Sequence, residues 1–139
     1  MPTPNIAPIL EFDPEREAFI EPGKVIRRRE VADACVLCFF QEVIDKTAVE
    51  RQARTVVENR WENGPHPIYE IEYLGQRLAF FHPGIGGPLA AALLEEAIGF
   101  GCRKFIVCGG CGVLEKGLAV GHLVVVSAAL RDEGTSYHY

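Results

Sequence analysis

Residues 79–113 read AFFHPGIGGPLAAALLEEAIGFGCRKFIVCGGCGV, and this stretch decides the fold. An apolar run that ends at Phe81 leads through a glycine turn into Pro88, and proline is favoured at the start of a helix. Leucines and alanines then recur at helical spacing until Gly101 stops the pattern. A second apolar run, 105–108, ends in a further glycine turn. The stretch predicts a strand, a glycine turn, a helix, a strand and a second glycine turn.

This strand–helix–strand unit places both glycine turns at the ends of strands. A helical crossover makes a parallel pair, and parallel sheets bind ligands beyond the carboxyl ends of their strands. Glycine lets a backbone approach a ligand closely, and the free N–H groups at the helix start favour an anion or a polar oxygen. The unit therefore predicts half of a small-molecule pocket, with tight turns of an ordinary α/β core as the alternative. The glycines match neither a dinucleotide fingerprint nor a P-loop.

The remaining chain extends the α/β pattern. Residues 1–33 are rich in proline and predict an extended arm ahead of a domain at 34–139. A continuous apolar strand at 34–40 and a helix at 41–53 form a second strand–helix unit. We also expect a hairpin, with strands at 68–73 and 77–81, that leads into the central unit. A buried strand at 122–130 is expected to follow the central unit.

Composition restricts the class of protein. The chain has 139 residues, of which 48% are hydrophobic, so it is most simply one domain with one core. Its formal net charge is −5 and its basic residues are scattered, which argues against an extended nucleic-acid surface. The N-terminus does not resemble a secretory signal, and no apolar run approaches the length of a membrane span. We expect a cytoplasmic protein that binds neither nucleic acid nor a membrane.

The five cysteines fit a reducing compartment better than a disulfide framework. Cys35 and Cys38 fall in a predicted strand, where residues three apart point to opposite faces and cannot share a metal. Cys108 and Cys111 bracket two glycines at a strand end, yet zinc would need further ligands and no helix begins there. We expect no metal site, and interpret Cys108 and Cys111 as small buried residues that line the turn.

Four motifs carry a family resemblance. They are EFDPEREAFIEP (11–22), GIGGPLAAALLEEA (84–97), KFIVCGGCGVL (104–114) and VGHLVVVSAALRDEGTSYHY (120–139). In this order they resemble the purine nucleoside and uridine phosphorylase family, most closely its branch with a long N-terminal arm. The resemblance implies a three-layer α/β/α fold with a mixed central sheet, of which 34–139 would be a truncated, N-terminal half. It also implies homo-oligomers that use no cofactor and bind a nucleoside with phosphate as co-substrate.

The resemblance also implies where substrate binds. The turn formed by Gly109, Gly110, Cys111 and Gly112 would lie against ribose and base, and Cys111 stands where some bacterial purine members also have cysteine. Arg131 follows a predicted strand and is a candidate substrate ligand, with an ion pair to Asp132 or Glu133 as the alternative. His82 and His138 are candidate polar lining, with a structural role as the alternative; His66 and His122 have weaker claims.

This chain departs from the family pattern at its phosphate positions. Val107 stands where many members carry a phosphate-binding arginine, and Gly110 lacks the hydroxyl found in the family's turn. The predicted strand at 34–40 is not followed by the family's Gly-Asp-Pro-x-Arg loop. The family's ribose-binding glutamate and base-protonating group belong to its second half, so no catalytic residue is assigned here.

Three functions follow from this comparison. The first is a nucleoside phosphorylase-type protein, incomplete as this chain, that would transfer a pentosyl group from base to phosphate. The second is a nucleosidase that uses water, which the valine at position 107 favours. The third is a truncated remnant that binds a ligand without catalysis. In each case we expect oligomerisation or domain exchange, because a half-domain exposes a sheet edge.

Overall fold

The centre of the fold is a mixed sheet with strand order β2-β5-β6-β1-β7. The structure, a computed structural model, describes residues 14–139. Strand β1 runs parallel to β6 and β7, whereas β5 is antiparallel to β2 and β6. A separate two-stranded ribbon joins β3 and β4. The strands are β1 (Ala34–Cys38), β2 (Arg54–Val57), β3 (Arg60–Trp61), β4 (Gly64–Pro65), β5 (Ile68–Tyr73), β6 (Gln76–Phe81) and β7 (Lys104–Cys108).

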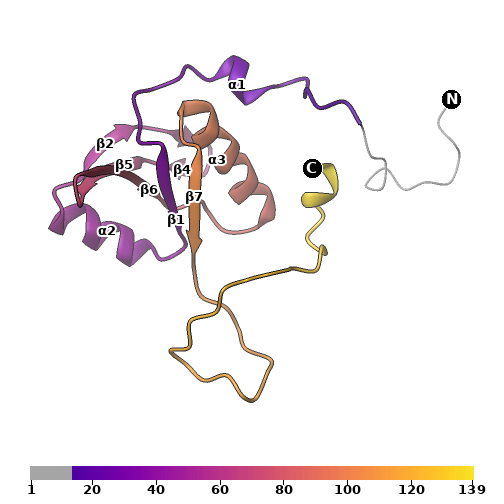
Figure 1. Cartoon of the computed structure of the whole chain (residues 1–139). Helices are drawn as coiled ribbons and strands as arrows, with labels where there is room; N and C mark the ends of the chain where they lie inside the picture. The colour runs from indigo at the N-terminus through magenta and orange to yellow at the C-terminus, as the bar shows by residue number, and fades with distance from the viewer. Residues whose placement is uncertain (1–13) are drawn as a thin grey trace, which may run out of the picture.

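Helices cover the two faces of this sheet (Figure 1). Helix α2 (Gln41–Glu50) packs Ile44 against Cys38 and Phe80, and helix α3 (Gly87–Phe100) packs Leu93 and Ala97 on the opposite face. Because side chains alternate along a strand, neighbouring residues of β1 and β6 enter different cores. The three-layer α/β/α fold with a mixed sheet, expected from the sequence, is confirmed.

Helix α3 has the ends that its sequence predicts. It follows Gly86, whose φ of 95° favours glycine, and it carries Pro88 in its first turn. It stops at Gly101, whose φ is 140° and whose amide donates to the Ala97 carbonyl at 3.1 Å. One expectation about this unit is wrong: β6 and β7 are parallel but not adjacent, because β1 lies between them and pairs with both.

The described part of the N-terminal arm contacts α3 through one short helix (Figure 1). It forms the single-turn helix α1 (Pro22–Val25), which packs against α3. Gly99 permits this contact, because a Cβ there would lie 3.1 Å from Ile26 Cδ1. The rest of the predicted arm, residues 1–13, falls outside the described residues.

The predicted buried strand at 122–130 is not formed. This stretch has no regular secondary structure and pairs with no described strand, and its apolar side chains are exposed; Leu123 and Leu130 are 100% and 98% exposed. Figure 1 shows the chain leaving β7, looping below the sheet and returning beside α3, where Ser136–His138 form a 3-10 turn. The prediction failed because apolar residues favour burial, whereas a strand also needs a paired neighbour and a covering layer.

Candidate functional site

The carboxyl ends of three strands meet at one edge of the sheet. Because β1, β6 and β7 are parallel, Leu37 lies opposite Phe81 and Cys38 lies opposite Cys108. The residues that follow these pairs therefore open onto the same edge. This edge carries both predicted glycine turns.

His82 follows β6 directly and is fixed by the turn after it. Its Nδ1 accepts a hydrogen bond from the Gly84 amide at 3.0 Å, and its ring meets Phe39 edge-on with centroids 6.1 Å apart. An accepting Nδ1 carries no proton, so the neutral ring bears its hydrogen on Nε2. Among residues 14–139, Nε2 has no hydrogen-bond partner. His82 thus presents a free donor at the sheet edge.

The turn after β7 packs on the residues that follow β1. A Cβ at Gly109 would lie 3.2 Å from Phe39 Cδ2, and a Cβ at Gly110 would lie 3.5 Å from the Phe40 ring. Gly109 and His82 therefore both contact Phe39, which follows the strand between theirs. Gly112 has open space where a side chain would be, and Cys111 is exposed. Cys111 is thus not the buried residue expected from the sequence.

Arg131 lies on the C-terminal segment. Its guanidinium stacks over the Tyr137 ring at 5.7 Å, and its carbonyl accepts from the Tyr137 hydroxyl at 3.0 Å. Among the described residues it forms no ion pair with Asp132 or Glu133, and it does not contact the glycine turn after β7. His138 lies in the adjacent 3-10 turn and is exposed.

The C-terminal segment also meets the start of α3. A Cβ at Gly87 would lie 2.9 Å from Glu133 Cγ and 3.2 Å from Thr135 Oγ1. Hydrogen bonds from the Ser136 side chain and amide lower the pKa of Glu133 to about 2. A carboxylate and a hydroxyl therefore lie beside the glycine turn where we expected backbone N–H groups to face an anion.

A cavity of about 320 Å³ opens beside His82 on the α2 face. Its polar lining comes from four elements: Gln41 begins α2, His66 follows β4, Tyr69 lies on β5 and His82 follows β6. From the sequence alone, His66 has only a weak claim as a residue of the site, because its place beside His82 depends on the β3–β4 ribbon folding back on the sheet. Prolines on both sides of His66 were the available signal of a fixed turn.

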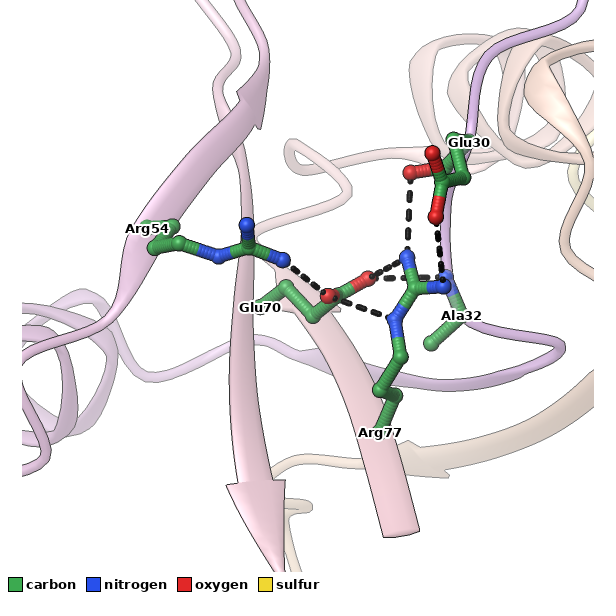
Figure 2. A network of polar contacts seen from close by, with 5 residues as sticks. All are labelled: Glu30, Ala32, Arg54, Glu70 and Arg77. Carbon is green, nitrogen blue, oxygen red and sulfur yellow. Dashed lines mark hydrogen bonds and ion pairs between the residues drawn. The ribbon is translucent and has the colours of Figure 1, made fainter.

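The most extensive ion-pair network lies away from this edge (Figure 2). Glu70, 3% exposed, accepts from Arg54 at 2.9 Å, from Arg77 at 2.8 and 2.9 Å, and from the Ala32 amide at 2.9 Å. Burial alone would raise the pKa of Glu70, but these hydrogen bonds outweigh it and hold the pKa below its ordinary value. Ala32 precedes β1, so the network closes the amino end of the sheet and has a structural role.

Four of the five free cysteines lie in the two hydrophobic cores. Cys35 and Cys102 share one core, and Cys38 and Cys108 share the other. Cys35 and Cys38 point to opposite faces of β1, as predicted. A hydrogen bond with Cys102, together with burial, raises the pKa of Cys35, while burial and Cys38 raise the pKa of Cys108. Within residues 14–139 no three histidine, cysteine or acidic side chains are grouped to hold a metal, and no helix is long and apolar enough to span a membrane.

The sequence and the fold of this chain are similar to those of known proteins. The sequence profile of the phosphorylase superfamily matches residues 33–139. The chain belongs to the phosphorylase superfamily. It is 38% identical to a guanosine phosphorylase of Halorubrum lacusprofundi over 94% of this chain and 46% of that protein. It is also 38% identical to a uridine phosphorylase of Thermococcus kodakarensis, over 49% of this chain and 24% of that one.

Membership of the phosphorylase superfamily agrees with the fold. The crystal structure of uridine phosphorylase from Vibrio fischeri ES114 superposes with a TM-score of 0.55 and 21% identity, covering 66% of this chain and 37% of that chain. The resemblance inferred from the four motifs is therefore confirmed at the level of family and fold. The chain spans about half the length of the guanosine phosphorylase, and its match covers a smaller share of the Thermococcus kodakarensis uridine phosphorylase.

Proposed function

We propose that this chain builds the sheet-edge part of a nucleoside site of the phosphorylase type. The reaction is displacement of the base from a nucleoside by phosphate, which gives ribose 1-phosphate and needs no other cofactor. One observation carries the proposal: in a member of the phosphorylase superfamily, His82 and the turn after β7 both pack against Phe39 at the carboxyl edge of parallel strands.

The substrate ligands in this proposal come from two segments. The turn after β7 offers backbone groups to the sugar and base; it consists of Gly109, Gly110, Cys111 and Gly112. His82 offers its Nε2–H. Arg131 would reach phosphate only after leaving the Tyr137 ring, since its guanidinium is now stacked there. In the same proposal, residues 1–33 are an arm, 34–139 are the first half of the catalytic domain, and the cytoplasmic protein is a homo-oligomer.

Water in place of phosphate is the second candidate. Val107, where an arginine would bind phosphate, is 59% exposed, and Gly110 has no hydroxyl. A phosphate deprived of a guanidinium loses strong charge-assisted hydrogen bonds. Hydrolysis of the same bond needs no such ligand.

The deciding experiment measures base release by chromatography. Uridine and guanosine are incubated with the purified 139-residue chain, with and without inorganic phosphate. Phosphate-dependent release would support phosphorolysis, and phosphate-independent release would replace phosphorolysis by hydrolysis. Release under neither condition would reduce the role of this chain to ligand binding.

A further inference from the structure

Two imidazoles in the cavity beside α2 have complementary free atoms. Nε2 of His66 lies 3.1 Å from Asn63 Oδ1, and an amide oxygen only accepts, so this nitrogen donates. The free nitrogen of neutral His66 is then Nδ1, an acceptor. His82 is the opposite case: its Nδ1 accepts from Gly84 and its free Nε2–H donates. Two residues that line the cavity therefore each have a ring nitrogen without a partner among the described residues, one a donor and one an acceptor.

The other lining groups favour a neutral ligand. None of the residues that line this cavity is lysine or arginine, and Gln41 holds Asp45 through a 2.8 Å hydrogen bond from its amide. Its Oε1 is left as a further acceptor. An anion would need charged donors to replace its water, and the lining residues supply none. The apolar part of the lining comes from Ile44 and the prolines beside His66.

We propose that His66 and His82 bind a neutral group that carries a hydrogen-bond donor and acceptor side by side. Two parts of a nucleoside have this chemistry, the vicinal hydroxyls of the pentose and the lactam of the base. The cavity, at about 320 Å³, falls at the small end of the range for small-molecule sites. The inference rests on the proposed function for its ligand, and His66 is the residue that it adds to the site.

The test uses variants that remove only the free atom of each ring. Asparagine reproduces the Nδ1 position of histidine and glutamine reproduces Nε2. His82→Asn therefore keeps an acceptor for the Gly84 amide and loses the free donor. His66→Gln keeps the contact with Asn63 and loses the free acceptor. His122→Asn is the matched control, because His122 Nδ1 accepts from the Ala119 amide at 3.2 Å outside the cavity.

Binding is measured by NMR titration of the full chain, without phosphate, using uridine, guanosine, ribose and uracil as separate probes. We expect a nucleoside to bind, with affinity reduced about ten-fold in His66→Gln and His82→Asn and unchanged in His122→Asn. Circular dichroism of each variant establishes that it folds. Binding of ribose alone would identify the hydroxyls as the recognised group, and binding of uracil alone would identify the lactam.

Two results would overturn the inference: unchanged affinity in either cavity variant, or no binding of any probe to the unmodified chain. Base release, measured on the same samples, separates this inference from the proposed function. Binding that depends on both histidines without base release would refute the reaction and support the subsite. Base release that neither substitution alters would support the reaction and refute the subsite.

Discussion

Gly84 and Gly86 both have positive φ, of 76° and 95°, yet their surroundings differ. A Cβ at Gly84 would collide with the Leu89 side chain, whereas a Cβ at Gly86 would meet nothing within 4 Å. The first glycine is therefore required by close packing as well as by backbone conformation. It also supplies the amide that orients His82.

Alanine substitution separates these two requirements. We expect Gly86→Ala to cost about 1 kcal/mol of unfolding free energy from strain alone, and Gly84→Ala to cost about 3 kcal/mol because the clash adds to the strain. Urea denaturation of both variants measures the difference. Equal losses would mean that Leu89 moves aside freely.

Glu70 gives the fold an acid-sensitive contact. Its pKa is lowered in the folded state, so the stability it contributes is complete above the unfolded pKa of about 4.3 and is lost as pH falls through the folded value. We expect Glu70→Gln to lower the free energy of unfolding by about 2 kcal/mol at neutral pH and by much less near pH 3. The exposed Glu72, on the same strand, provides the control Glu72→Gln. A pH-independent loss in Glu70→Gln would contradict this assignment.

Among the elements, α3 is joined to the β2–β3 region by polar contacts across the core. Glu96 accepts hydrogen bonds from the side-chain Nδ2 of Asn59 and, at 2.9 Å, from Trp61 Nε1. Glu95, its neighbour on the same helix, instead interacts with Tyr139. These two carboxylates show how adjacent residues of one helix connect different parts of the chain.

Truncation of each carboxylate tests that division. We expect Glu96→Ala to lose about 1–2 kcal/mol of stability and to change the fluorescence of Trp61, the only tryptophan, because its indole N–H loses its partner. Glu95→Ala is expected to leave that fluorescence unchanged. Thermal denaturation followed by tryptophan emission measures both effects, and identical spectra for the two variants would exclude the contact.

At the scale of the whole molecule, a sheet edge and an apolar segment are both exposed. Strand β7 lies at the end of the sheet and pairs on one side only among residues 14–139, and Ile106 is 69% exposed. The stretch 122–130 adds Val125, 93% exposed, and further exposed valines and leucines. Open edges and β-branched apolar runs are sites of strand pairing between molecules.

We therefore expect the chain to self-associate through these surfaces. Val125→Lys should shift sedimentation towards the monomer, because a charge on an apolar strand opposes edge pairing. Val49→Lys on α2, where Val49 is 79% exposed, should leave the distribution unchanged. A monodisperse monomer before substitution would rule out this association.

The order of strands and helices followed from local physics. Apolar periodicity with Pro88 and Gly101 predicted α3, and the alternation around Cys35 and Cys38 predicted opposite faces, because both depend only on nearest neighbours along the chain. The placement of His82 and both glycine turns at one edge followed as well, since parallel strands end together.

Contacts between distant segments could not be predicted in this way. The insertion of β1 between β6 and β7, the place of His66 beside His82, and the approach of Glu133 to Gly87 all depend on which surfaces meet once the chain has collapsed. The same reason explains the error at 122–130, whose apolar sequence favours burial but contains no information on whether a neighbouring strand is present. Periodicity along the chain thus set the elements, while pairing and packing across the chain decided the site.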